Sequence, residues 1–202
     1  MGGVIVRAVV LSSFDGLGGV DVSQVDEPVV ADDGVLIRVV YAALGPWDVA
    51  TTHGAFAGAG GGNGFPQVLG WDFAGIVESV GVQVSGFASG ERVLGFSPQP
   101  WSGIGALAEL IAVPAATIAA VPTGLDLPAA AALPVSGLTA MLTLDSAAVV
   151  SADAVLVVGA TGGVGGFVTQ LARARGAPGD RIGGRVRSGC GTRARRERGR
   201  GS

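Results

Sequence analysis

The sequence has no lysine, one cysteine and one histidine among its 202 residues. A single cysteine, Cys190, excludes an internal disulfide framework. A catalytic zinc needs about three protein ligands of His, Cys or carboxylate type, and one imidazole with one thiol supplies too few of the usual donors. We therefore expect no metal site.

Long apolar runs are also missing, although 49% of the residues are hydrophobic and the mean hydropathy is +0.55. No run of about 18 apolar residues escapes a charge, a proline or a glycine, so no membrane-spanning helix is expected. The apolar stretch 4–11 is interrupted by Arg7 and lacks a small-residue cleavage site, so it is not expected to be a secretory signal. A cytoplasmic protein with one or two packed domains is expected.

The charge is unevenly distributed along the chain. All 13 basic residues are arginines, and eight of them lie in 178–202, beside seven glycines and only two acidic residues. This segment has too few apolar residues to bury a strand, so we expect a disordered Arg/Gly-rich tail.

Three explanations of that tail remain open. It could bind nucleic acid, although no aromatic residue is interleaved to stack on bases, so this partner is not expected. It could belong to a natural short form with an interaction tail. It could also result from a reading-frame shift near codon 177, which we favour, because a lysine-free, Arg/Ala/Gly-rich chain suggests GC-rich coding.

Residues 1–122 consist of short apolar segments between turn signals. Their β-branched and apolar content predicts strands at 4–10, 35–42, 72–81, 91–96 and 105–114. Several strands at this spacing favour an antiparallel barrel or sandwich.

From 123 to 177 the pattern is that of an α/β domain. Asp126, followed by Leu127 and Pro128, predicts a helix start, and Pro134 predicts a second helix that runs to about 144. Residues 155–158 are apolar on both faces, which is typical of a central parallel strand covered by helices.

A glycine turn follows that predicted strand. Gly159, Gly162 and Gly165 precede an amphipathic pattern with a predicted apolar face of Val164, Phe167, Val168, Leu171 and Ala172. Such a turn brings main-chain N–H groups and a helix N-terminus against a pyrophosphate without obstruction by a Cβ atom. A turn built only for packing is the alternative, and dinucleotide binding is favoured by the strand and helix on either side. The predicted cofactor-binding residues are Gly159, Ala160, Thr161, Gly162, Gly163, Val164 and Gly165.

Several motifs together resemble one enzyme family. The glycine turn in "VLVVGATGGVGGFVTQLARARGA", the strand and turn in "VLIRVVYAALGPWD" and the segment "PQVLGWDFAGIVESVGVQVSGFASGERVLGF" are similar to zinc-independent medium-chain dehydrogenases/reductases of the quinone oxidoreductase (zeta-crystallin-like) group. The resemblance covers nearly all of 4–177. It implies a mixed β and α/β fold: a GroES-like β-barrel catalytic domain at 1–122, then the first βα units of a Rossmann cofactor domain at 123–177, with the active site between them.

The sequence departs from the family pattern at two places. Gly45 stands where the family has an Asn, and Gly70, Trp71 and Asp72 stand where zinc alcohol dehydrogenases carry Gly-His-Glu. The resemblance thus implies NADPH-dependent hydride transfer, with NADH as the alternative cofactor, to a quinone, enone or related activated carbonyl, without a metal.

The catalytic candidates lie near the implied cleft. Thr52 and His53 could supply the proton, and Asp48 could take part or could only cap a short helix. Thr139 lies where family members approach the nicotinamide, although a mid-helix threonine can simply bond to its own backbone. Trp47 and Trp71 could wall an aromatic substrate pocket or pack at a domain boundary.

A doubly wound domain needs two βαβαβ halves, and only one strand and one helix precede 178. We therefore expect a C-terminally incomplete chain that exposes apolar surface, tends to aggregate and binds NADPH weakly or not at all. We expect it to be weakly active or inactive, with homodimers only in a full-length form. Two alternatives stay open: a non-catalytic binding or scaffold module whose basic tail contacts acidic partners or nucleic acid, and a relative of zinc alcohol dehydrogenases.

Overall fold

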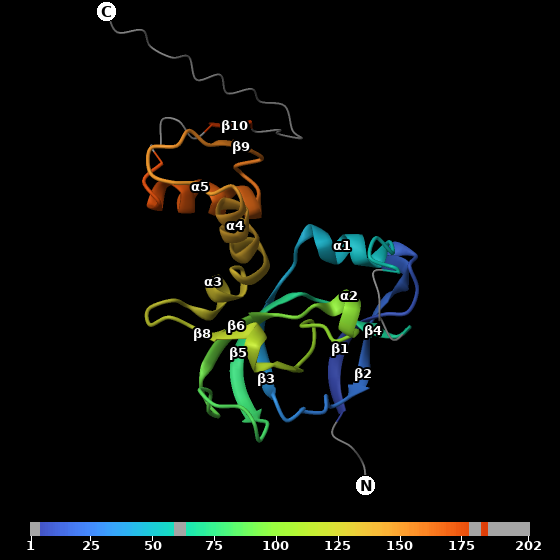
Figure 1. The fold of residues 1–202 in the computed structure, drawn as a ribbon. Helices are drawn as coiled ribbons and strands as arrows, with labels where there is room; N and C mark the ends of the chain where they lie inside the picture. Colours follow the sequence, from blue (N-terminus) through green and yellow to red (C-terminus); the bar gives the residue numbers. More distant parts are fainter. Residues whose placement is uncertain (1–4, 59–63, 178–182, 186–202) are drawn as a thin grey trace, which may run out of the picture. The chain divides into compact units, whose positions relative to one another are not determined.

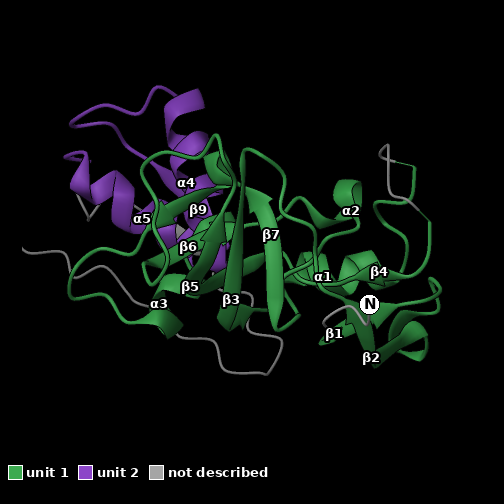
Figure 2. Ribbon diagram, turned by 90° about the horizontal axis from the view of Figure 1, so that it is seen from below, with its two compact units in different colours: residues 1–135 green, residues 136–202 purple. Residues whose placement is uncertain are grey.

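The computed structural model describes residues 5–58, 64–177 and 183–185 (Figure 1). The chain divides into two compact units, Met1–Val135 and Ser136–Ser202 (Figure 2). The elements of the first unit are β1 (Ile5–Leu11), β2 (Val20–Asp26), β3 (Gly34–Ala43), α1 (Pro46–Thr52), β4 (Gln67–Val68), β5 (Asp72–Val80), β6 (Arg92–Phe96), α2 (Gln99–Ser102), β7 (Leu110–Pro114), β8 (Ile118–Ala120) and α3 (Leu127–Ala131). Helix α4 (Pro134–Ser146) begins at the boundary and is followed by β9 (Leu156–Val158), α5 (Gly163–Ala174) and β10 (Gly183–Arg185).

The first unit is built on antiparallel strands. Five of them form one sheet in the order β7-β3-β5-β6-β8, and three form a second sheet in the order β2-β1-β4. Alternate residues of β3, such as Val35 and Ile37, point into the buried core. Arg38 points to the opposite face of the sheet, where its Nε donates a hydrogen bond to Glu78. The core of this unit consists of Val35, Ile37, Phe73, Val77, Val93, Ala106, Ile111 and Val113.

The two sheets meet at one edge. The main-chain N–H of Val9 donates to the carbonyl of Leu107 at 2.8 Å, and the N–H of Glu109 donates to the carbonyl of Arg7 at 3.0 Å. Within the described residues the strands do not close into a single barrel, which corrects that detail of the prediction. The reason is that β4 and β8 are only two and three residues long, so they offer few ladder hydrogen bonds for closure.

Helix α3 belongs to the first unit. The Asp126 carboxylate accepts a hydrogen bond from the N–H of Ala129 at 2.9 Å, as predicted for a helix cap. The small side chains of Ala130 and Ala131 then pack closely against Ala74 of β5. The expected boundary at 122/123 therefore falls earlier than the boundary between the compact units.

The second unit has a small core around α5. The predicted helix face is confirmed, because Val168 and Ala172 are buried and Val164, Phe167 and Leu171 pack beside them. Gly176 follows the helix with φ +87°, as expected of a residue that ends a helix. None of the described helices is long and apolar enough to cross a membrane.

Strand β9 is covered on one face only: Val157 is 6% exposed, whereas Leu156 and Val158 are 77% and 78% exposed. The strand is therefore not covered on both faces, and it exposes apolar surface, as expected of an incomplete cofactor domain. One expectation about the second unit was wrong. The residues Gly183–Arg185 form β10, which pairs in parallel with β9, although no strand was expected after 177. Pairing uses main-chain N–H and C=O groups and needs no apolar side chain. The rest of the 178–202 tail lies outside the described residues.

Candidate functional site

The glycine turn joins β9 to α5, and its conformation requires glycine at positions where a Cβ atom would be strained or would collide. Gly159 has φ +82°, a conformation that glycine adopts without strain. A Cβ atom on Gly165 would collide with the carbonyl oxygen of Gly159, and one on Gly163 would lie 2.9 Å from Ser136 Oγ. The glycines therefore allow the first turn of α5 to pack closely against the main chain of Gly159.

The same turn leaves room for an anionic group. Helix α5 has 12 residues and Gly162 as its N-cap, without a side-chain cap, and the first turn of a helix has N–H groups with no partner inside the helix. Thr161, Gly162 and Gly163 are exposed. These features fit the pyrophosphate of a dinucleotide, since main-chain donors and the positive end of the helix dipole favour negative charge.

Not every residue of the predicted cofactor turn faces outward. Ala160 and Val164 pack against the core of the second unit, so they could meet a cofactor only through their main chains. Thr139 is exposed on α4, where its carbonyl accepts the Thr143 hydroxyl at 2.7 Å. The side chain that lies beside the glycine turn is Ser136, one helical turn earlier and only 8% exposed.

Helix α1 holds the catalytic candidates of the first unit. Oδ2 of Asp48 accepts the N–H of Gly45 at 2.7 Å, so this carboxylate caps α1. The hydroxyl of Thr52 donates to the carbonyl of Val49 at 2.8 Å. His53 is exposed at the end of the helix and packs against Gly16. The side chains of Asp48 and Thr52 thus form hydrogen bonds within α1, whereas His53 contributes its main-chain N–H, which donates to the carbonyl of Ala50 at 3.2 Å.

A second buried carboxylate lies near Asp48. Burial raises the pKa of Asp72 from 3.8 to about 6; the N–H of Val135 opposes the rise, and the charge of Asp48 adds to it. The indole of Trp47 interacts weakly with Asp72 and lowers this pKa slightly. Burial also raises the pKa of Asp48, against the hydrogen bond from Gly45. The region thus holds two acids whose charged forms are disfavoured by desolvation.

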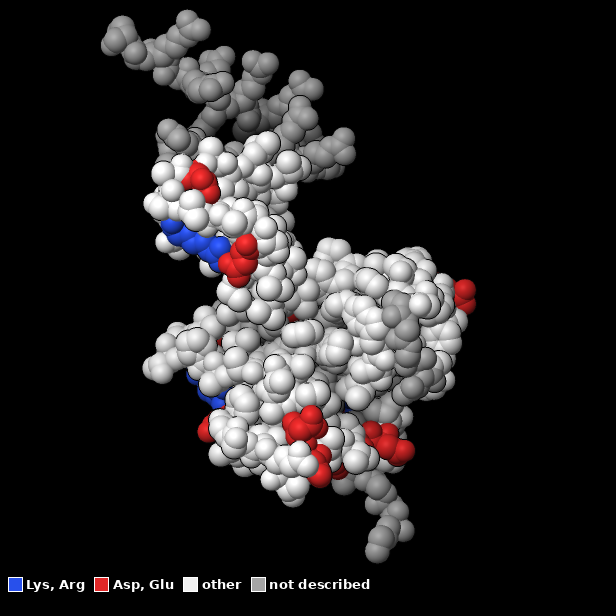
Figure 3. Space-filling model, viewed as in Figure 1, with Lys and Arg blue, Asp and Glu red and all other residues white. Residues whose placement is uncertain are grey.

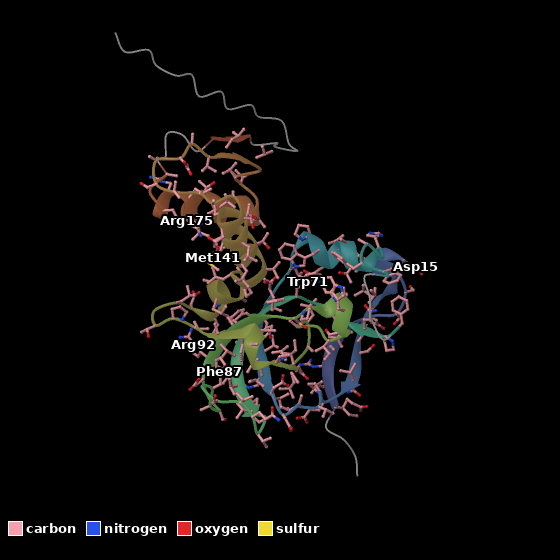
Figure 4. All side chains as sticks on the ribbon, viewed as in Figure 1. Asp15, Trp71, Phe87, Arg92, Met141 and Arg175 are labelled. Atoms are coloured by element: carbon pink, nitrogen blue, oxygen red, sulfur yellow. The ribbon has the colours of Figure 1, made fainter. Side chains whose placement is uncertain are left out.

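All three tryptophans of the chain contribute to one group of aromatic rings, which we call the tryptophan cluster: Trp47, Phe56, Trp71 and Trp101. The ring of Trp71 lies 6.3 Å from Trp47, 5.4 Å from Phe56 and 5.7 Å from Trp101, measured between ring centroids. Figure 4 places Trp71 between α1 and α2. The sequence pointed to Trp47 and Trp71 but missed Phe56 and Trp101, which belong to a turn and a four-residue helix without periodic signal.

Comparison with known proteins relates the chain to one group of oxidoreductases. The alcohol dehydrogenase GroES-like domain matches residues 31–123. The chain is 39% identical over 169 residues to a 2-methylene-furan-3-one reductase of Solanum lycopersicum, and 35% identical over 168 residues to an NADPH-dependent alkenal/one oxidoreductase of Arabidopsis thaliana. The quinone oxidoreductase of Coxiella burnetii has a similar structure, with a TM-score of 0.78 at 29% identity, over 86% of this chain.

The chain belongs to the medium-chain dehydrogenase/reductase family. It spans 43% of the length of both the tomato and the Arabidopsis relatives and 55% of the Coxiella chain. The matched regions cover 80% and 79% of this chain, so they include residues of both units.

The described residues were compared with the needs of a metal site. Within residues 5–58, 64–177 and 183–185, no three His, Cys, Asp or Glu side chains are arranged to hold a metal ion. Arg175 and Asp145 form an ion pair whose atoms are 2.6 Å apart. On the face drawn in Figure 3, the charged side chains lie in small groups separated by uncharged surface. The glycine turn and the tryptophan cluster are therefore the candidate sites that the structure brings forward.

Proposed function

We propose that the protein is an NADPH-dependent, zinc-independent oxidoreductase of the quinone reductase type, which reduces a quinone, enone or related activated carbonyl. The observation that carries the proposal is the turn at 159–165, where side chains are excluded and the N-terminus of α5 is open to an anion. The names of the family members support the reaction class, and that of the Arabidopsis relative supports NADPH.

The bound nicotinamide would supply a hydride, and the protein would supply binding, orientation and a proton route. The turn would hold the pyrophosphate through the main chain of Gly159, Gly162 and Gly163, with Ser136 beside it. The substrate gains a hydride and a proton, which together deliver two electrons. We assign the proton to His53, because the Asp48 and Thr52 side chains are already bonded within α1.

We also propose that cofactor binding is weak in this chain. The described sheet of the second unit has two strands of three residues, and the apolar face of β9 is open. The glycine turn at 159–165 rests on this small sheet, and little packing holds the turn rigid. Part of the free energy of cofactor binding is therefore lost in ordering the turn.

The test is NADPH oxidation at 340 nm by the purified chain, with menadione or an aryl enone as acceptor and with EDTA present. We expect a slow rate that depends on both protein and acceptor, is unaffected by EDTA and is lower with NADH. A rate restored only by added zinc would overturn the zinc-independent proposal. Absence of any protein-dependent oxidation at saturating NADPH would overturn the proposed reaction.

A further inference from the structure

The buried face of helix α4 begins with a polar side chain. Ser136, Ala140 and Leu144 are spaced by four residues, so they lie in one row along α4. Ala140 and Leu144 pack into the core that α4 shares with α5 (Figure 1). Ser136, at the start of the row, is only 8% exposed. A buried hydroxyl costs free energy unless it has a partner, so its presence in this row needs a reason.

The Ser136 hydroxyl points toward the first residue of α5. A Cβ atom built on Gly163 would lie 2.9 Å from Oγ of Ser136 and 3.7 Å from its Cβ, so the hydroxyl is the nearer part of the side chain. Within the described residues this hydroxyl has no hydrogen-bond partner. It is not one of the described unpaired atoms that are sealed from solvent, so its oxygen keeps an accessible surface.

Two helix starts meet at this hydroxyl. Ser136 is the third residue of α4 and Gly163 is the first residue of α5, so the positive ends of both helix dipoles lie beside the same oxygen. The neighbouring space is open, because Cβ atoms built on Gly137 and Gly159 would meet nothing within 4 Å outside their own stretches of chain. An accessible hydroxyl between two positive helix ends is a donor suited to an anion.

The position of Ser136 is fixed on both sides along the chain. The main-chain N–H of Val135 donates to Oδ1 of Asp72 at 2.6 Å, which holds the residue before Ser136. Ala140 and Leu144 hold the following turns of α4 against the core. A donor that is held in place before binding loses little freedom when a ligand arrives, so more of its hydrogen-bond free energy appears as affinity.

We propose that Ser136 is a cofactor-binding residue, and that its hydroxyl donates a hydrogen bond to the pyrophosphate of the dinucleotide at the start of α5. The inference rests on the proposed function, and it adds to the glycine turn a donor from a different helix. The turn supplies main-chain N–H groups, which no substitution of a side chain removes, whereas Ser136 supplies a single oxygen that can be deleted. The same contact gives a reason for the glycine at 163, because a methyl group there would crowd the hydroxyl.

The test is the binding of NADPH to Ser136→Ala, which removes the oxygen and keeps the Cβ atom. NADPH is titrated into the full 202-residue protein, and the fluorescence of NADPH reports binding. We expect the dissociation constant to rise about tenfold, as for the loss of one hydrogen bond to a charged group. Ser146→Ala is the matched control, since it makes the same change at the exposed last residue of the same helix and should leave the dissociation constant unchanged.

Urea unfolding separates the loss of a ligand contact from the loss of structure. Because the Ser136 hydroxyl bonds to no described residue, Ser136→Ala should unfold at the same urea concentration as the wild type. A variant that is less stable and binds NADPH as tightly as the wild type would show that the hydroxyl only supports the packing of α4, and would overturn the inference.

Inorganic pyrophosphate identifies the part of the cofactor that Ser136 contacts. It shares only the phosphates with NADPH, so the concentration that displaces NADPH should also rise about tenfold in Ser136→Ala, after correction for the weaker binding of NADPH. If Ser136→Ala weakens the binding of NADPH and leaves that of pyrophosphate unchanged, the hydroxyl contacts another part of the cofactor and the assignment is wrong.

The outcomes separate this inference from the proposed reaction, because NADPH binding does not require turnover. Weaker binding by Ser136→Ala without any reduction of menadione supports the inference, and the proposed reaction then fails alone. Oxidation of NADPH by the wild type, with an unchanged dissociation constant and KM for NADPH in Ser136→Ala, overturns the inference and leaves the reaction standing. Absence of NADPH binding to the wild type also overturns the inference.

Discussion

The carboxylate of Asp72 accepts a hydrogen bond from the main-chain N–H of Val135 at 2.6 Å, although the two residues are 63 positions apart. Asp72 begins β5 and Val135 lies in the first turn of α4, so a buried acid from the sheet serves one of the N–H groups that a helix start leaves open. This hydrogen bond and the helix dipole favour the ionised form of Asp72, whereas burial disfavours it. The effect of burial is the larger, so the pKa of Asp72 is raised.

This balance predicts a pH dependence of stability. The pKa of Asp72 is about 6 in the folded protein against 3.8 as its ordinary value. Between about pH 4 and pH 6 the folded state therefore binds more protons than the unfolded state, and the free energy of unfolding falls as pH rises, then stays low above that window. Asp72→Asn keeps an oxygen that can accept the N–H of Val135, and it cannot ionise. Its free energy of unfolding relative to the wild type should therefore increase as pH rises through this window, by on the order of 2 kcal/mol.

Urea unfolding at pH 4, 6 and 8 measures this difference. Asp126→Asn, which alters an exposed capping carboxylate, is the control. A constant difference between Asp72→Asn and the wild type at all three pH values would contradict the assigned pKa.

The open face of β9 predicts self-association. Leu156 and Val158 point to the exposed face and Val157 to the core, in keeping with the alternation of a strand. The double substitution Leu156→Thr, Val158→Thr should reduce aggregation without loss of stability, because no packing is removed. Val157→Thr should instead destabilise the second unit by about 1–3 kcal/mol, since it buries a hydroxyl.

Light scattering during storage and urea unfolding distinguish the two variants. If the double variant aggregates as fast as the wild type, the β9 face is not the surface through which molecules associate.

The role of His53 is tested by His53→Gln, which keeps a polar side chain against Gly16 but cannot donate a proton as an imidazolium does. Because solvent can partly replace the donor, we expect turnover to fall about a hundredfold. Unaltered turnover across pH 6 to 8 would show that His53 only packs against Gly16.

Much of the framework could be predicted because its residues carry local signals. The strands at 35–42, 72–81 and 91–96 were placed within about two residues of β3, β5 and β6, since turn residues and apolar β-branched runs mark them. The Asp126 cap and the apolar face of α5 follow from side-chain chemistry and helical spacing, and both were confirmed.

What the sequence could not provide depends on tertiary contacts. Strand β4 and helix α2 have two and four residues, too few for any periodicity, yet α2 delivers Trp101 to Phe56 and Trp71. Ser136 was missed because its position beside Gly163 is set by the packing of α4 on α5, which no local pattern encodes.

The most direct test of the account is the binding of NADPH to Gly165→Ala beside Gly166→Ala. A Cβ on Gly165 collides with Gly159, whereas one on Gly166 meets only the carbonyl oxygen of Ala160, at 3.8 Å, which is ordinary contact. Titration of NADPH fluorescence should show weak, saturable binding to the wild type and to Gly166→Ala, and none to Gly165→Ala. Equal binding by both variants, or none by the wild type, would contradict the assignment of the turn at 159–165 as the cofactor site.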